Sequence, residues 1–343
     1  MKNSTGKLIF TIVLACVLAV PLSLGAQQKA GPRKDLSFGT SSTGSTFYII
    51  TVGMANLITK QMGVNVTAEP VGGSDANVYA VKGKKIDLAM LNTHAVAAAY
   101  AGAEQFSKAG KVPLRVLIQG QESLRYIIAR KSSGIETAAD FKGKKVIGKR
   151  RAAVDVEMVT NGLLKAYNLP KESVKILEAV ETNEVLDAIK IGAVDAVVVQ
   201  AGVRASNLMD LANSTDVIFL SVPDDKLQVM LKELGPAFHK GTVPAGTYKG
   251  QAEAVHVPAL FVSVCVLADF SEDLAYAITK TLMENQPALK AVHAVGAQWT
   301  LKSTLSPPAA PYHPGAIKYF KEKKVWNANL EKVQQELLKA GGN

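Results

Sequence analysis

Cysteine is almost absent from this sequence: it occurs twice in 343 residues, at Cys16 and Cys265. Two cysteines so far apart exclude a disulfide framework, a Cys-x-x-Cys redox pair and a cysteine-rich zinc site. The five histidines are scattered, and none has the spacing of a helical zinc-binding motif. We therefore expect neither a metal centre nor a cofactor.

Acidic residues are in the minority, because 39 Lys and Arg stand against 29 Asp and Glu, for a formal charge of +10. The basic residues are nevertheless spread along the whole chain. The densest runs, at 82–85 and 142–145, fall at expected turns without a basic helix or interleaved aromatic residues. We interpret them as solvated turns and expect no nucleic-acid partner. With 48% apolar residues, the chain has enough material for one large core or two smaller ones.

Long apolar runs are missing except near the start of the chain. Lys2 and Lys7 precede an apolar-leaning stretch from 8 to 24, and small or polar residues follow it. This order is typical of a secretory signal, and it predicts cleavage after Ala26 and export to the periplasm. An uncleaved membrane anchor is one alternative. Lipid attachment at Cys16 is another, although the residues after it are apolar rather than polar.

After residue 33, short apolar runs alternate with segments of helical periodicity, which favours an α/β fold with largely parallel sheets. The predicted strands are 36–39, 64–69, 87–91, 115–119, 126–129, 145–148, 174–177, 196–200, 217–220 and 260–266. One predicted helix buries Phe47, Ile50, Met54, Leu57 and Ile58 on one face. Further helices are predicted near the C-terminus, at 275–285 and 330–338.

The two halves of the chain contain a similar segment. Residues 78–92 and 185–200 share the order of helix end, glycine turn, aspartate, apolar strand and terminal carboxamide, which is Asn92 in one and Gln200 in the other. Two similar lobes would explain the likeness, although common α/β patterns also produce it by chance.

Two loops have the composition of an anion site. In open α/β sheets a ligand lies outside the carboxyl ends of the strands, where loops lead into helix N-termini. Loop 39–46, Gly-Thr-Ser-Ser-Thr-Gly-Ser-Thr, offers backbone N–H groups, hydroxyls and the positive end of the next helix. Ser45 stands where a nucleotide-binding P-loop requires lysine, which argues against ATP or GTP. Loop 72–77 has the same character, and helix capping without a ligand is the alternative for both.

The second half of the chain supplies cationic candidates. Arginine can hold a carboxylate through two parallel hydrogen bonds, so Arg150 or Arg151 is a candidate anchor for an acidic ligand. Arg204 follows the strand that ends at Gln200 and is a further candidate. A solvated basic turn is the alternative in each case.

Catalytic motifs are missing as well, since the sequence has neither a Gly-x-Ser-x-Gly elbow nor a His-Glu-x-x-His helix. His94 or His313 would act as a general base only if distant residues assembled around it. We therefore expect a binding protein and no enzyme.

The chain from 36 to about 326 resembles the TAXI-type solute receptors of tripartite ATP-independent periplasmic (TRAP) transporters. The segments that carry the resemblance are FGTSSTGSTFY (38–48), GGSDAN (72–77), IDLAML (86–91), ADFKGKKV (139–146), VPAGTY (243–248) and PYHPGA (311–316). The ADFKGKKV piece is common among two-lobed binding proteins. The first, VPAGTY and PYHPGA pieces together are specific.

The resemblance implies an α/β, two-lobed periplasmic binding protein of type II, a Venus flytrap with two crossing strands. Lobe 1 would comprise residues 33–121 and 260–343 and lobe 2 residues 122–259, with crossings near Gln121 and Pro258. Family ligands are of the glutamate, glutamine and 2-oxo-dicarboxylate type. The implied partners are this ligand and membrane permease subunits driven by an ion gradient, and we expect a monomer.

The resemblance also implies a set of cleft residues. Matching positions in the first lobe are Thr43, Gly44, Ser45, Tyr48, Ser74, Asn77, Asn92 and Thr93, and the second lobe contributes Gln200 and its neighbours. The residue argument adds Arg150 and Arg204. Where the family often has Gly-Ala-Pro-Gly-Ser-Gly, this chain has Gly-Lys-Arg-Arg-Ala-Ala at 148–153. We hypothesise a more anionic ligand held by Arg150.

These observations predict a periplasmic receptor that captures a small organic acid, such as glutamate, glutamine or a dicarboxylate, for uptake by a TRAP transporter. A sensor subunit of the same fold and a cell-envelope hydrolase are the alternatives.

Overall fold

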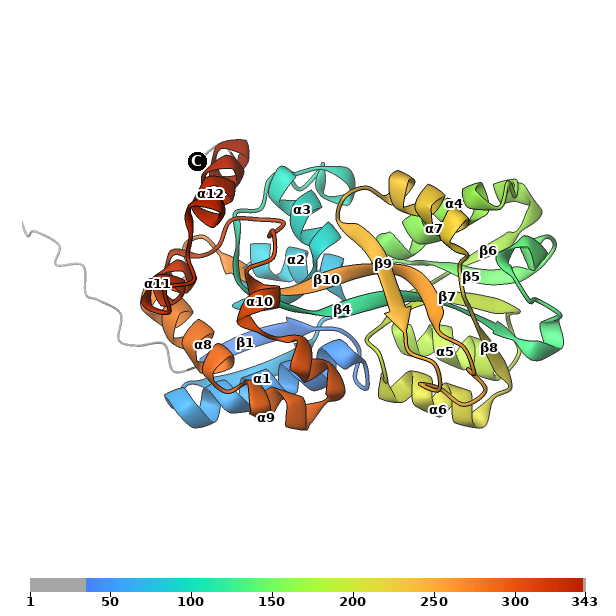
Figure 1. Ribbon diagram of the computed structural model, residues 1–343, viewed down its shortest axis with the longest axis horizontal. Helices are drawn as coiled ribbons and strands as arrows, with labels where there is room; N and C mark the ends of the chain where they lie inside the picture. The colour runs from blue at the N-terminus through green and yellow to red at the C-terminus, as the bar shows by residue number, and fades with distance from the viewer. Residues whose placement is uncertain (1–34, 342–343) are drawn as a thin grey trace, which may run out of the picture. The chain divides into compact units, whose positions relative to one another are not determined.

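The computed structural model describes residues 35–341. The predicted signal segment, residues 1–26, lies outside the described residues, and so does Cys16. Within them, strands of one mixed sheet run through the middle of the structure and helices flank the sheet on two sides (Figure 1). No helix in this part of the chain is long and apolar enough to span a membrane.

Most strands lie close to where the sequence predicts them, but β9 is not among the predicted strands, and the predicted strands 115–119 and 126–129 are one continuous strand, β4. They are β1 (Asp35–Thr40), β2 (Asn65–Pro70), β3 (Leu88–Asn92), β4 (Leu114–Arg130), β5 (Lys145–Arg150), β6 (Lys175–Ala179), β7 (Ala196–Ala201), β8 (Val217–Leu220), β9 (Phe238–Val243) and β10 (Val255–Leu267).

The sheet consists of two parallel halves joined by two long strands. Its order is β2-β1-β3-β10-β4-β7-β5-β6, with β8 on β4 and β9 on β10. In one half β1 pairs in parallel with β2 and β3, and in the other β5 pairs in parallel with β6 and β7. β4 and β10 run antiparallel to each other and to their neighbours. The α/β class is confirmed, but the sheet is mixed rather than largely parallel, because these two strands cross against both halves.

The helices connect and cover the strands. They are α1 (Thr46–Met62), α2 (Ser74–Lys82), α3 (Thr93–Ala101), α4 (Asp155–Ala166), α5 (Thr182–Lys190), α6 (Ser206–Ser214), α7 (Asp224–Leu234), α8 (Glu272–Glu284), α9 (Gln286–Val292), α10 (Leu301–Thr304), α11 (Pro314–Glu322) and α12 (Ala328–Gly341).

Helix α1 shows how local sequence fixes an element beside the cleft. Ser45 caps its N-terminus by accepting a hydrogen bond from the N–H of Tyr48 at 3.2 Å. Gly63 ends it in the left-handed conformation, with φ of 66°. The predicted apolar face is buried throughout, so the helix packs against the sheet and its N-terminus is held at the sheet edge.

Buried apolar side chains form separate clusters in the two halves. One cluster draws on residues 36–118 and 262–320, and two others draw on residues 124–260. Ala275, Ile278 and Leu282 of α8 belong to the first cluster, so this C-terminal helix packs against the first half of the sheet. Burying an aliphatic side chain of this size contributes about 1.5–3 kcal/mol. The lobe boundaries near Gln121 and Pro258 stay a prediction.

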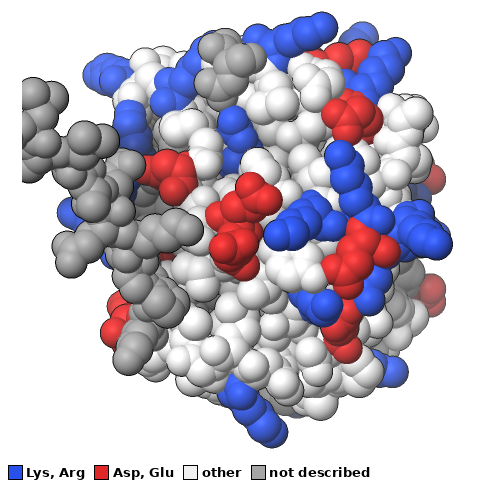
Figure 2. Space-filling model, turned by 90° about the vertical axis from the view of Figure 1, so that its left-hand side faces the viewer, with Lys and Arg blue, Asp and Glu red and all other residues white. Residues whose placement is uncertain are grey.

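Surface charges of both signs are mixed where α8 and α11 lie. Figure 2 shows Lys and Arg interspersed with Asp and Glu on this face. Lys280 lies 3.2 Å from Glu322, and Lys323 lies 2.6 Å from Glu284. The basic excess of the chain is therefore not gathered into one patch on this face.

Candidate ligand-binding cleft

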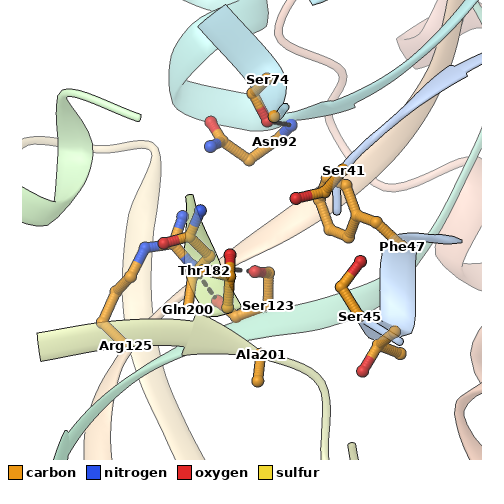
Figure 3. A pocket seen from close by; sticks show the side chains of 12 residues that line it. Ser41, Ser45, Phe47, Ser74, Asn92, Ser123, Arg125, Thr182, Gln200 and Ala201 are labelled. Carbon is orange, nitrogen blue, oxygen red and sulfur yellow. Dashed lines mark hydrogen bonds between the residues drawn. The ribbon is translucent and has the colours of Figure 1, made fainter. Parts of the chain in front are cut away.

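A pocket lies between the two halves of the sheet, where loops and helix N-termini from both meet. Its volume is about 20 Å³, room for about one water molecule, so the two sides of the pocket lie close together. In Figure 3, Ser74 and Asn92 stand on one side, Ser41, Ser45 and Phe47 on a second, and Arg125, Thr182, Gln200 and Ser123 on a third. The lining residues are Ser41, Ser45, Thr46, Phe47, Gly73, Ser74, Asn92, Ser123, Arg125, Thr182, Gln200 and Ala201.

Four helices begin at this pocket. Ser45 is the N-cap of α1, Gly73 is the N-cap of α2, Asn92 is the N-cap of α3, and Thr182 is the first residue of α5. Each helix N-terminus carries partial positive charge and backbone N–H groups without a partner inside the helix. Their convergence makes the pocket suited to an anion.

Arg125 is the charged residue of the pocket lining. It lies on β4 and is fully buried, with 0% exposure. Its Nε donates to the carboxylate of Asp155 on α4, which is also fully buried, and its Nη1 donates to Ser123 O at 2.7 Å and to Ser123 Oγ at 2.9 Å. Its Nη2 has no hydrogen-bond partner among the described residues. A buried guanidinium thus keeps one donor group free.

Several predicted site residues come together in this pocket: Ser45, Ser74, Asn92 and Gln200 all line it. Ser74 Oγ accepts a hydrogen bond from Asn92 N at 3.0 Å, which ties the α2 and α3 N-termini together. Both ends of the Asn92 side chain have a partner, since its Oδ1 accepts from Ala95 N at 2.8 Å and its Nδ2 donates one hydrogen bond to Asp155 at 3.2 Å. Gln200 Oε1 is buried without a partner.

Other predicted residues are buried nearby without lining the pocket. Asn77 donates from Nδ2 to Met90 O at 2.9 Å, so it holds α2 against β3. Thr93 lines a separate, mostly apolar pocket with Phe261 and His239. Arg150 is 3% exposed, and its Nη2 donates to Gly72 O. Burial lowers the pKa of Arg150 from its usual value.

The remaining predicted residues lie nearer the surface. Thr43 is exposed, and Gly44 and Tyr48 are half-buried. Arg204 is exposed and has a positive φ of 62°, and its carbonyl lies 3.1 Å from His293 Nε2. The structure does not bring these four into the pocket lining.

The prediction from sequence missed Ser123, Arg125 and Thr182. Ser123 and Arg125 are two residues apart on β4 and therefore point to the same face, a signal that the sequence contained. Ser41, Thr46 and Gly73 fall within the two loops singled out as anion sites, although they were not named as ligand-contacting residues. Thr182 opens a helix that the sequence analysis did not link to the cleft.

Beside the pocket, a group of polar contacts joins the two halves directly. We call Ser42, Gly72, Asp75, Arg150, Ala152, Val154 and Glu181 the seam. Val154 N donates to Asp75 Oδ2 at 2.8 Å, and Asp75 N donates to Ala152 O at 3.3 Å. Ser42 Oγ donates to Glu181, and Arg150 donates to Gly72 O. These contacts hold the two sides of the cleft together.

Gly73 lets the seam close. Its φ is 149°, and a Cβ built there would lie 3.0 Å from Ala152 O and 3.1 Å from Arg150 Nη2. A side chain at this position would therefore strain the backbone and press on the opposite half.

Asp75 has an unusual titration for an aspartate. It is 4% exposed. Burial, and next the charge of Asp155, raise its pKa to about 6, against the hydrogen bonds from Val154 N and Gln105 and the charge of His94. A cleft that opens would expose Asp75 and separate it from Asp155, so the position of the halves and its proton are linked.

The two histidines considered as bases lie away from the pocket lining. His94 Nε2 is 3.1 Å from Glu104, and His313 caps α11 while its Nε2 lies 3.1 Å from Phe270 O. Burial lowers the pKa of His313. Within residues 35–341, no group of three or more His, Cys, Asp or Glu side chains is placed to hold a metal ion.

Comparison with known proteins gives one family. The model of the NMT1-like family matches residues 38–323. The solved structure of PhnD1 from Prochlorococcus marinus (MIT 9301) in complex with methylphosphonate is similar, with a TM-score of 0.52 and 11% identity over 85% of this chain and 99% of that chain. The periplasmic aliphatic sulphonate binding protein SsuA from Escherichia coli gives a TM-score of 0.49 and 16% identity, over 89% of this chain and 86% of that chain. The predicted fold class, a two-lobed binding-protein architecture, is confirmed.

Proposed function

The chain belongs to the NMT1-like family, and from this premise we propose that it is a solute receptor that captures a small organic acid between its two lobes. One observation carries the proposal: four helix N-termini and a buried arginine converge on a pocket lined from both halves of the sheet. A ligand that touches both halves stabilises the closed arrangement over the open one, so capture and closure are one event.

The pocket chemistry supports binding rather than catalysis. None of the twelve residues that line it is a histidine, cysteine, aspartate or glutamate. No hydroxyl of its serines and threonines is hydrogen-bonded to a carboxylate or a histidine of the described residues, so none is paired with a general base that would activate it as a nucleophile. The hydroxyl groups are suited instead to donating and accepting hydrogen bonds with a ligand.

Transport is the role we propose for this receptor. The TAXI-type resemblance supports delivery of the bound acid to membrane permease subunits of a TRAP transporter, driven by an ion gradient. Residues 1–26 would direct export to the periplasm, where such a receptor meets its solute. Ser45, Ser74, Asn92 and Gln200 would touch the ligand. We propose that the other predicted residues hold the helix N-termini and the closing surfaces in place; they are Thr43, Gly44, Tyr48, Asn77, Thr93, Arg150 and Arg204.

The test is a binding screen with purified protein. Thermal unfolding is measured with amino acids, monocarboxylates, dicarboxylates, phosphate and sulphonates, and hits are confirmed by calorimetry. A true ligand at about a thousand times its Kd stabilises the protein by about 4 kcal/mol. Gln200→Leu should lower the affinity for the ligand found in the screen, whereas Gln335→Leu, on an exposed face of α12, should leave that affinity unchanged.

Two outcomes would contradict the proposal. One is a protein that no small anion in the panel stabilises. The other is turnover of a bound acid, which would make the pocket an active site.

A further inference from the structure

Arg125 has hydrogen-bond donors for which the described residues supply no acceptor. Three of its five N–H donors are used, one by Asp155 and two by Ser123. Both N–H groups of Nη2 lack a partner among the described residues, although the side chain is 0% exposed. Leaving a buried charged donor unsatisfied is costly, so an acceptor from a ligand is the expected complement. A carboxylate oxygen is the acceptor that suits a guanidinium best.

The charges around the pocket limit how much negative charge that ligand can carry. Arg125 already has a counter-ion in Asp155. Asp75 and Glu181 flank the pocket in the seam, and Arg150 is the second buried cation there. Three carboxylates thus stand against two guanidinium groups before a ligand enters. The helix N-termini add further positive potential, and each amounts to a fraction of a charge.

A second unpartnered atom has the opposite polarity. Gln200 Oε1 is buried and accepts no hydrogen bond from any described residue. It lines the pocket on the same side as Arg125 and Thr182 (Figure 3). A ligand that filled both positions would present a carboxylate to Arg125 and an N–H or O–H donor to Gln200.

We propose, resting on the receptor function above, that the ligand is a small monocarboxylate with an amino or hydroxyl group on the carbon next to the carboxylate. The carboxylate accepts from Arg125 Nη2, and the amino or hydroxyl group donates to Gln200 Oε1. Ser123 Oγ already accepts from Arg125, and no described residue accepts from its O–H, so this hydroxyl is free to donate to the same carboxylate. Arg150 Nη1 is also buried without a partner in the described part of the chain, but only Arg125 lines the pocket, so the anchor is Arg125 rather than Arg150.

A second carboxylate on the ligand is disfavoured in this site. It would enter a buried region that already holds Asp75, Asp155 and Glu181, and no further free cation lines the pocket within the described residues. Burying an unpaired charge is far more costly than burying a neutral polar group. The charges around the pocket therefore disfavour the more anionic ligand that was hypothesised from the sequence.

The experiment is a calorimetric titration with five acids of equal carbon number: butyrate, 2-hydroxybutyrate, 2-aminobutyrate, malate and aspartate. The 2-substituted monocarboxylates should bind at least about tenfold more tightly than butyrate, which leaves Gln200 unpaired. They should also bind at least about tenfold more tightly than malate and aspartate, which add a second carboxylate. Gln200→Leu should abolish the preference over butyrate while the protein still folds.

Variants of two arginines on one strand provide the matched control. Arg125→Lys keeps a positive charge but loses the planar guanidinium group that can donate two parallel hydrogen bonds, so the affinity for every acid should fall by about a hundredfold. Arg115→Lys changes another buried arginine of β4, which does not line the pocket and whose Nη1 donates to Leu114 O at 2.9 Å. This variant should leave the affinity for every acid unchanged.

The outcomes separate the inference from the function. Tighter binding of malate or aspartate than of the monocarboxylates would overturn the inference while the receptor function stood. So would a ligand without a carboxylate, or an Arg125→Lys variant with normal affinity. A protein that binds none of these acids and no other small anion would overturn both.

Discussion

The pocket and the seam are built from the same kinds of residue but do different things. Each has a buried arginine and a nearby buried aspartate: Arg150 and Asp75 belong to the seam, and the pocket residue Arg125 pairs with Asp155 beside the pocket. In the seam these groups mostly bond across the cleft to the other half, as Arg150 does with Gly72 O and Asp75 with Val154 N. In the pocket, Arg125 Nη2 and Gln200 Oε1 are buried without a partner among the described residues, and in the seam only Nη1 of Arg150 is in that state. The pocket therefore offers both a free donor and a free acceptor to a ligand, whereas most polar groups of the seam are paired across the two halves.

The largest expected effect comes from breaking the pocket's own ion pair. Asp155→Ala would leave Arg125 buried without a counter-ion and remove the acceptor of Asn92 Nδ2. Breaking a buried pair on one side costs about 3–5 kcal/mol of unfolding free energy. Urea unfolding followed by circular dichroism measures this loss. A change below about 1 kcal/mol would show that the pair is not the buried contact described here.

The substitution expected to disturb the seam most is at the neighbouring Gly73. Gly73→Ala places a Cβ against Ala152 O in a backbone conformation that side chains rarely adopt. Strain of this kind costs about 1–3 kcal/mol, so ligand affinity should fall about tenfold or more if closure is what the variant obstructs. Calorimetry with the best ligand gives the affinity. Gly134→Ala, where φ is also positive at 71° and no atom lies within 4 Å of the added Cβ, controls for backbone strain alone.

The seam should also respond to pH through Asp75. With the cleft closed its pKa is about 6, and in an open cleft it should lie nearer the ordinary value of about 4. Closing then takes up a proton between these two values, so lower pH favours the closed state. When the pH is lowered from 7.5 to 5, the affinity for the ligand should rise by about tenfold because of this group. Asp75→Asn should remove most of that rise. If the rise persists in the variant, a group other than Asp75 causes the pH dependence.

The smallest effect is expected at the exposed rim of the closure. Ser206 Oγ donates to Gly44 O at 3.1 Å, and Ser206 is exposed. Solvent competes for such a bond, which contributes about 0.5–1 kcal/mol at most. Ser206→Ala should therefore change affinity by less than about fivefold. A larger loss would mean that the rim, and not the buried seam, controls closure.

Local patterns in the sequence predict most of the strands and helix α1, because each depends on neighbouring residues, whereas β9 is not predicted. The long strand β4 was instead predicted as two strands, 115–119 and 126–129, and that prediction is wrong. The polar run Gly120-Gln121-Glu122-Ser123 hides the continuity. Trp299, far away in the chain, covers Gly120 and donates to Gln121 Oε1 at 3.2 Å, so this part of the polar run is buried against the C-terminal segment.

The choice between the two arginines was also beyond sequence reasoning. Arg150 follows a strand next to a basic turn and looks like a ligand contact, whereas Arg125 lies inside an apolar strand. Only the folded arrangement pairs Arg125 with Asp155 and places Arg150 against Gly72 O. Of the predicted cleft residues, Ser45, Ser74 and Asn92 at helix starts and Gln200 near a strand end line the pocket, because the parallel topology brings such points together.

A structure of the protein with its bound solute tests the central claim most directly. We expect a carboxylate oxygen about 2.7–2.9 Å from Arg125 Nη2 and a donor of the same ligand on Gln200 Oε1, with the seam contacts of Asp75 and Arg150 in place. A ligand bound elsewhere, with Arg125 Nη2 facing only water, would contradict the account.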